Sequence, residues 1–343
     1  MCIRDRTLNP LAGLDVAAVA GLDFLLGEVQ QFTPSTSYSE TTIGVPEIER
    51  GIYKKSKNVT TNLSANVRVN YNRVFAGKHD LTVGANMDYY LTLLDNVGIT
   101  GYGVGTINSS SAINQSLSGN RKPAVSGLKD KSAQLGFGGV FGYTFDGTYD
   151  LYATYKADAS SILPANKRWN SAWAVSAGWT PTRYAFLEDQ KVLTYLNLKA
   201  SYGYTANLSG VSVSSTVATF AFSNGSYENQ RPLDFITLYN KDLKPEQTKS
   251  VDVGLHIGLF DRVDISLNWY NRRTEQALLD VPIPSSTGYT SLQRNIGVLQ
   301  NKGYEITVNG RILDKGDWLL SLGVNFSYNS NKVLDLYYAD KIY

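Results

Sequence analysis

The chain has little of what most enzymes and soluble binding domains depend on. One cysteine, Cys2, and two histidines occur in 343 residues, so a zinc site built from the usual cysteine and histidine ligands is not predicted. The formal net charge of +2 favours no nucleic-acid surface. No apolar run approaches the roughly 18 residues of a membrane-spanning helix. These absences exclude helical membrane proteins, nucleic-acid binders and the common metalloenzymes, and we predict no catalytic residues, metal or cofactor.

A regular alternation of apolar and polar residues is what the chain does contain. From Ser250 to Phe260, valine, leucine or isoleucine occupies every second position, and Asp252, Gly254 and His256 lie between them. Successive side chains of a strand point to opposite faces, so this pattern indicates a sheet with one apolar and one polar face. About eleven such stretches follow one another along the chain, which predicts an all-β, antiparallel fold.

The predicted strands cover most of the chain, with a short helical turn expected within 181–191. Their approximate bounds are 11–32, 59–75, 81–91, 132–145, 148–158, 171–180, 193–206, 250–260, 263–279, 303–313 and 318–334.

The connections between these strands alternate in length. Short turns are expected near residues 78, 147, 186, 261 and 315, and mostly long connections near 45, 113, 165, 227 and 290. This alternation is typical of an up-and-down transmembrane barrel in an outer membrane, where about 9–11 tilted residues cross the bilayer. The charged residues of the strand centres all fall on the predicted polar face: Asp88, Lys156, Lys199, Asp252, Asp264, Glu305 and Arg311.

The two ends of the sequence lack the features of natural termini. Met1 to Arg6 has no apolar stretch of a signal peptide and looks like a translated sequencing adapter, so we interpret residues 1–6 as a non-native scar. The segment from Tyr338 to Tyr343 carries no terminal signal. We therefore interpret residues 7–343 as a partial barrel domain from the interior of a longer protein.

Several segments resemble the SusC/RagA family of TonB-dependent outer-membrane transporters. In order and spacing they look like the second half of that family's barrel, and the resemblance runs from about residue 7 to the end. The segments are Leu198–Asn207, Leu243–Thr248, Asn268–Thr274, Val281–Tyr289, Asn295–Gly297 and Asn301–Glu305.

This resemblance implies a barrel of about 22 strands, of which the chain would supply about half. It also implies a location in the bacterial outer membrane, in contact with outer-membrane lipid. The function would be active import of large nutrients, oligosaccharides or peptides, without an enzymatic step. The implied partners are the TonB complex, acting through an N-terminal region and plug that this sequence does not match, and a SusD-like surface lipoprotein.

Aromatic residues in the predicted outer loops are the candidates for contact with cargo. Such rings can stack on sugars or contact a capping lipoprotein. For Trp169 the alternative is membership of an aromatic girdle at the membrane interface, and for Tyr239 and Tyr289 it is packing within their own loops. The candidates are Tyr102, Trp169, Tyr227, Tyr239 and Tyr289.

Two other functions are compatible with the alternating pattern. A passive porin or structural outer-membrane barrel would lack a plug and conduct ions steadily. A secreted, soluble β-rich adhesin or glycan-binding protein would partition into water without detergent. Bilayer conductance and detergent partitioning separate these alternatives from an importer.

Overall fold

The structure is a computed structural model that describes residues 2–104, 121–188, 190–208, 210–211, 213–222, 230, 232–235 and 237–336. Long strands dominate these residues, joined by short helical turns. The strands are β1 (Cys2–Leu11), β2 (Leu14–Thr33), β3 (Ile52–Phe75), β4 (His79–Tyr102), β5 (Ala124–Phe145), β6 (Tyr149–Ser160), β7 (Trp169–Trp179), β8 (Leu193–Asn207), β9 (Phe220–Phe222), β10 (Leu233–Phe235), β11 (Glu246–Leu259), β12 (Val263–Pro282), β13 (Ser291–Lys315) and β14 (Trp318–Asp335). The helices are α1 (Tyr38–Thr42), η1 (Glu47–Glu49), η3 (Ala165–Lys167), η4 (Pro181–Arg183), α2 (Ala185–Glu188), α3 (Val213–Thr216) and η5 (Ser285–Thr287).

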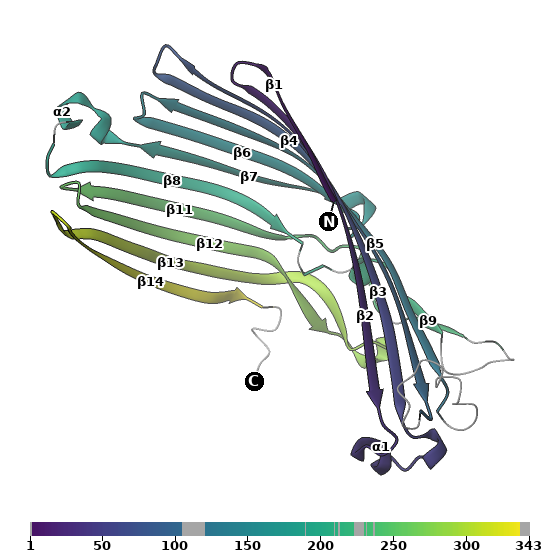
Figure 1. Ribbon diagram of the computed structural model, residues 1–343. Helices are drawn as coiled ribbons and strands as arrows, with labels where there is room; N and C mark the ends of the chain where they lie inside the picture. The colour runs from purple at the N-terminus through teal and green to yellow at the C-terminus, as the bar shows by residue number, and fades with distance from the viewer. Residues whose placement is uncertain are drawn as a thin grey trace. The chain divides into compact units, whose positions relative to one another are not determined.

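Twelve of the strands form one sheet, in the order β1-β2-β3-β4-β5-β6-β7-β8-β11-β12-β13-β14. Each described strand pair is antiparallel, and Figure 1 shows β8 and β11 to β14 lying side by side. The small β9–β10 hairpin is separate and lies within the connection from β8 to β11. The predicted all-β, up-and-down order is confirmed. The sheet has one strand more than predicted. The additional strand, β1, includes residues 2–6 of the segment that we interpret as a non-native scar.

The predicted strands are present, but several extend beyond their predicted ends. β4 continues to Tyr102, β5 begins at Ala124, and β13 begins at Ser291 inside a predicted loop. Backbone pairing continues there, but charged residues such as Asp95, Lys129 and Arg294 interrupt the apolar alternation that identifies a strand. The long connections are correspondingly shorter than predicted.

The predicted alternation of short and long connections holds for most of the chain, but the connection from β7 to β8, predicted to be short, covers 180–192 and is longer than 161–168 and 283–290, which were predicted to be long. Two residues, Gly316 and Asp317, separate β13 from β14, whereas the segment from β8 to β11 includes a helix and a hairpin. Asp146 and Gly147 have φ of 52° and 64°, as a type I′ hairpin turn requires. The connection from β7 to β8 contains η4 and α2, the helical turn expected there.

The described chain divides into two compact units. The first contains residues 1–6, 18–66 and 88–134, and the second contains 7–17, 67–87 and 135–343. In the first unit Tyr53 and Val104 are buried and pack with Phe32. Gly51 has φ 92° beside them, and a Cβ there would collide with the Val104 carbonyl oxygen. In the second unit, Leu163 and Leu243 are buried and lie within the connections from β6 to β7 and from β8 to β11.

Candidate functional site

Strand register sorts the side chains of the second unit into two faces. One row of directly opposed residues crosses from β14 to β6 and is entirely apolar or aromatic. Its members are Tyr328, Tyr304, Trp269, Val253, Ala200, Ala177 and Leu151. The row through Leu255 has the same character, with Phe326, Ile306, Leu267, Leu198 and Trp179. We call this the apolar face.

The opposite face carries the charged and hydrogen-bonding groups. The row through Gly254 contains Ser327, Glu305, Asn268, Lys199, Gly178 and Asp150. Asp252 and Asp264 lie on the same face, which we call the polar face, and Arg272 lies 3.7 Å from Asp252. Because successive residues alternate without a bulge through these central rows, the predicted sorting of charge is confirmed.

Glycines on the polar face make room for larger neighbours. Tyr270 donates a hydrogen bond to Asn329 Oδ1 at 3.3 Å, and its ring lies over Gly303. A Cβ on Gly303 would lie 2.6 Å from Tyr270 Oη and would also collide with the Tyr328 carbonyl oxygen. The glycine of the Asn301–Glu305 segment is therefore required by the packing of two neighbouring strands.

Connections at the long-loop ends of β6, β8 and β12 come together in the second unit. Thr216 Oγ1 donates to the carbonyl oxygen of Ile162 at 2.6 Å, and Lys167 Nζ lies 2.7 Å from Asp242 Oδ1. The hydrogen bond from Lys167 lowers the pKa of the Asp242 carboxyl. Asn240 Nδ2 donates to the carbonyl oxygen of Gln293 at 2.9 Å. We call 161–168, the described part of 208–245, and 276–296 the loop cluster.

One side chain, Asn295, joins two strands of the loop cluster. Its Oδ1 accepts a hydrogen bond from the Lys244 N–H at 2.9 Å. Its Nδ2 donates to the carbonyl oxygens of Lys244 and Gln276 at 2.7 and 3.0 Å. Glu246 Oε1 accepts from the Leu278 N–H at 2.9 Å, and Leu243 is fully buried. The segments Leu243–Thr248 and Asn295–Gly297, far apart in sequence, therefore form one structural unit.

A polar hollow of about 350 Å³ lies beside Asn295. Gln276 has φ 58° at a register shift of β12, and its Oε1 is buried without a hydrogen-bond partner among the described residues. Amide, ammonium and guanidinium groups line the hollow together with the carboxylate of Asp242, so it can hydrogen-bond a polar ligand. The lining residues are Asn240, Asp242, Lys244, Gln276, Leu292, Arg294, Asn295 and Ile296.

Sequence reasoning did not identify Gln276 or Arg294 as site residues. The signal that was available is the loss of alternation after Thr274, where two residues of β12 face one of β13 and produce a bulge.

In the first unit a buried ion pair ties two connections together. Glu40 is 3% exposed, and its Oε2 accepts from the Gly51 N–H at 2.9 Å and from Arg121 Nη1 at 2.6 Å. Burial alone would raise the pKa of Glu40, but the hydrogen bonds from Arg121 and Gly51 outweigh it and hold that pKa below its ordinary value. The Arg121 guanidinium also lies 4.4 Å from the centre of the Tyr102 ring.

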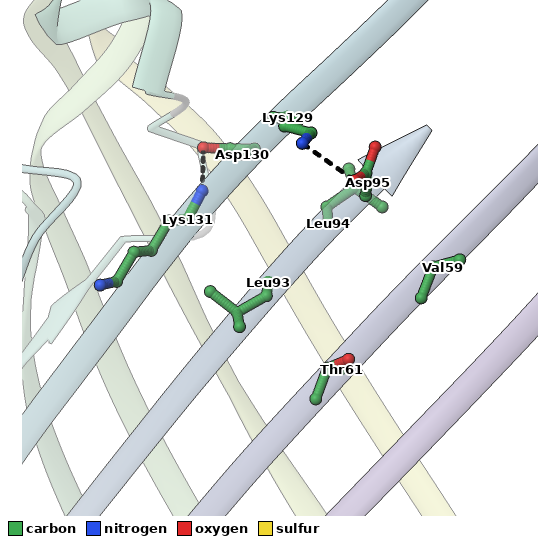
Figure 2. A pocket seen from close by; sticks show the side chains of 8 residues that line it. All are labelled: Val59, Thr61, Leu93, Leu94, Asp95, Lys129, Asp130 and Lys131. Carbon is green, nitrogen blue, oxygen red and sulfur yellow. Dashed lines mark hydrogen bonds and ion pairs between the residues drawn. The ribbon is translucent and has the colours of Figure 1, made fainter. Parts of the chain in front are cut away.

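A second hollow, of about 450 Å³, lies among β3, β4 and β5 of the first unit (Figure 2). Val59, Thr61 and Leu93 form much of its wall. Lys129 Nζ lies 3.4 Å from Asp95 Oδ2, and Lys131 extends along the same strand. This hollow combines an apolar wall with two ammonium groups and the carboxylates of Asp95 and Asp130.

The predicted aromatic candidates are placed as follows. Tyr102 has Arg121 over its ring, so that face is not free for a sugar. Trp169 shares the apolar face with Trp173 and stacks on Phe137 at 6.1 Å, which favours the girdle interpretation.

The remaining candidates lie in connections. Tyr239 is half-buried, with Lys241 Nζ 5.5 Å from its ring centre. Tyr289 is half-buried after η5, and its N–H donates to Thr287 Oγ1 at 3.4 Å. Tyr227 lies outside the described residues. No ring contact joins any two of the four described candidates.

Two kinds of feature are absent from the part of the chain that the structure describes. No three histidine, cysteine, aspartate or glutamate side chains in that part of the chain form a group that could hold a metal ion. None of its helices has the length and apolar content needed to cross a membrane.

The sorted faces and alternating connections define the class of protein as a partial barrel of the outer-membrane type. The family described as "TonB dependent receptor-like, beta-barrel" matches residues 8–341. The chain belongs to this family, whose members are outer-membrane receptors and transporters rather than enzymes.

Curated relatives carry the same description. TonB-dependent receptor P3 of Formosa agariphila is 27% identical over 334 residues, covering 96% of this chain and 32% of the relative. TonB-dependent receptor SusC of Bacteroides thetaiotaomicron is 28% identical over 217 residues, covering 60% of this chain and 21% of SusC. The chain thus spans about a third or less of the length of these relatives.

Solved structures agree with this assignment. The RagAB peptide importer in its closed-closed state matches with a TM-score of 0.84 and 26% identity, covering 97% of this chain and 36% of that chain. The ferric-catecholate import receptor Fiu of Escherichia coli K12 matches with a TM-score of 0.56 at 11% identity, covering 97% of this chain and 47% of that chain, which shows the fold alone. The predicted SusC/RagA resemblance and the partial barrel are confirmed.

Proposed function

We propose that this chain forms part of the barrel wall and extracellular loops of a TonB-dependent importer of large nutrients in a bacterial outer membrane. The observation that carries the proposal is the register of β6 to β8 and β11 to β14, which places every central charge on one face. A charge at mid-bilayer on the lipid face costs roughly 2–4 kcal/mol for Arg or Lys. The apolar face therefore suits lipid and the polar face suits an aqueous lumen.

In the complete protein, a plug inside the lumen and a TonB-interacting segment would supply the energised step. A SusD-like lipoprotein would close the outer mouth. Support for these partners comes from the similarity to SusC and to the RagAB importer.

Oligosaccharides or peptides are the proposed cargo. The hollow beside Asn295 offers the amides and cations that such polar molecules bind, and Tyr239 and Tyr289 lie in the adjoining connections. Trp169 suits the membrane interface better than the cargo, because it lies on the apolar face. Import proceeds by binding and passage, and no bond is made or broken.

Uptake by the complete protein in its native outer membrane tests this function. Labelled oligosaccharide and peptide pools would be supplied with and without TonB, and with and without a protonophore. We expect uptake to stop when TonB is absent and also when the protonophore collapses the proton gradient. Uptake that continues without TonB would overturn the proposal.

Conductance distinguishes the importer from the passive porin. The complete protein in planar bilayers should give no large, steady open channel, because a plugged lumen does not conduct freely. A permanent large conductance would assign the porin function instead.

A further inference from the structure

The apolar face of β11 to β14 changes character abruptly towards the long-loop ends. On β11 the residues from Leu259 back to Val251 are aliphatic at every second position, and the next is Lys249. On β12, Trp269 is followed on the same face by Asn271 and Arg273. On both strands the apolar face therefore changes from apolar to polar residues within one or two positions of that face.

The two neighbouring strands change at the same level. Lys302 follows Tyr304 on β13, and Ser330 and Lys332 follow Tyr328 on β14. Register places Lys249, Arg273, Gln300 and Lys332 in one row and Val251, Asn271, Lys302 and Ser330 in the row below. We call Lys249, Arg273, Lys302 and Lys332 the basic band.

Part of this positive charge is not neutralised. Glu275 lies 2.9 Å from Lys249 and 3.1 Å from Arg273. Lys302 and Lys332 are exposed, and neither has a carboxylate partner among the described residues. The basic band therefore has four cations for one neighbouring carboxylate.

The charge is confined to one end of the apolar face. The four rows that pass through Val263, Ile265, Leu267 and Trp269 contain no charged residue on β11 to β14. The last of these rows contains Trp269, Tyr304 and Tyr328, and such aromatics gather at membrane interfaces. On β11 the apolar face carries no charge from Val251 to Leu259, and this span agrees with the roughly 9–11 residues that cross a bilayer. The basic band thus lies directly beyond an aromatic row, at headgroup level.

We propose that the basic band binds the phosphate groups of a glycolipid in the outer leaflet of the membrane. The ligand is a membrane lipid because the band faces away from the polar face and adjoins the apolar belt. Neighbouring strands lie about 4.8 Å apart, so long Lys and Arg side chains on adjacent strands can reach one phosphate. Arg273 can bind phosphate oxygens in bidentate fashion, and Gln300 and Ser330 offer further hydrogen bonds.

The lipid proposal depends on the outer-membrane location but not on cargo or TonB, so it can fail while the import function stands.

Lipid retention by the complete protein tests the proposal. The protein would be reconstituted in phosphatidylcholine vesicles containing lipid A with its phosphates, or lipid A without them, then extracted and analysed by native mass spectrometry. We expect retention of the phosphorylated form alone. The double variant Lys302→Gln with Lys332→Gln should lower its affinity about 30-fold, since each lysine near an anionic surface accounts for about fivefold.

Two variants serve as controls. Lys191→Gln with Lys315→Gln removes the same charge from the short-turn end and should leave retention unchanged. Lys302→Arg with Lys332→Arg keeps the charge and should retain lipid, which separates loss of charge from loss of folding.

Three results would overturn the proposal. They are equal retention of both forms of lipid A, equal loss in the two glutamine double variants, and loss of a copurifying lipoprotein without loss of lipid. The last result would assign the basic band to a protein partner. Uptake assays are not needed for any of these outcomes.

Discussion

The ladder formed by β11 to β14 and the loop cluster beside it are held together by different interactions. In the ladder, each strand pairs with its neighbour through a run of backbone partners that has no bulge in its central rows, and the face of a side chain there follows from its position along the strand. In the loop cluster, a few side chains such as Asn295 and Glu246, with the buried Leu243, connect segments that no regular pairing joins. Stability is therefore distributed in the ladder and concentrated in the cluster.

The largest effect should come from placing a charged residue on the apolar face of the ladder. Leu255→Lys places a charge in the middle of the apolar face and should destabilise the complete protein in bilayers by roughly 2–4 kcal/mol. His256→Lys, on the polar face 3.7 Å from Asp264, should have little effect. Urea unfolding in phospholipid vesicles measures both. Equal effects would show that the two faces are not sorted between lipid and water.

A smaller effect should come from filling a glycine site in the ladder. Gly303→Ala forces a Cβ against Tyr270 and the Tyr328 carbonyl, so it should destabilise the protein by about 1–3 kcal/mol, as overpacking does. In Gly254→Ala the nearest atom would be 3.5 Å away, and stability should be nearly unchanged. Unfolding midpoints in the same vesicles compare the two variants. The packing explanation fails if Gly254→Ala proves the more harmful.

Asn295→Ala should affect the loop cluster and leave the ladder intact. It removes three hydrogen bonds, and at a net ~0.5–1.5 kcal/mol each with partial exposure, a local loss of about 1–2 kcal/mol is expected. Hydrogen exchange should accelerate at 243–248 and 276–279, but not at 263–269. Asn295→Asp keeps the acceptor for the Lys244 N–H and should protect that amide. Accelerated exchange throughout the ladder would mean that the two regions are not independent.

The smallest effect should be the pH dependence of the Lys167–Asp242 ion pair. Because the pKa of Asp242 is lowered in the fold, the stabilisation is present above the ordinary aspartate pKa of about 3.9 and is lost as pH falls through the lowered value. A spin label at Ala165 should become more mobile over that window. Asp242→Asn should remove the dependence, and a label that loosens equally in this variant would point to another group.

The strands could be predicted from sequence wherever one face contacts lipid and therefore carries only apolar side chains. From Val251 to Leu259, one apolar residue at every second position was enough to assign the strand and its faces. Where β4 and β13 extend to Tyr102 and Ser291, charged residues such as Asp95 and Arg294 interrupt the alternation. Backbone hydrogen bonds keep these ends in the sheet, although the interrupted pattern predicts loops there.

The site was less predictable than the fold. The segments Leu243–Thr248 and Asn295–Gly297 were recognised as distinctive, but their direct connection through Asn295 and Lys244 was not. The hollow that they border includes Gln276, placed by a bulge with φ 58°. Trp169 was proposed as a candidate for cargo contact. The structure places it on the apolar face of β7, where it stacks on Phe137.

The sequence by itself determined the strand order, most of the alternation of short and long connections, and which side chains of each strand share a face. These properties are local, because the two-residue period of a strand and the chemistry of a tight turn act over a few residues. Only the tertiary structure decided which residues of neighbouring strands are opposed. That register assembles Lys249, Arg273, Lys302 and Lys332 into one band and places Asn295 against Lys244. Backbone pairing between distant segments sets this register, and no single segment of the sequence encodes it.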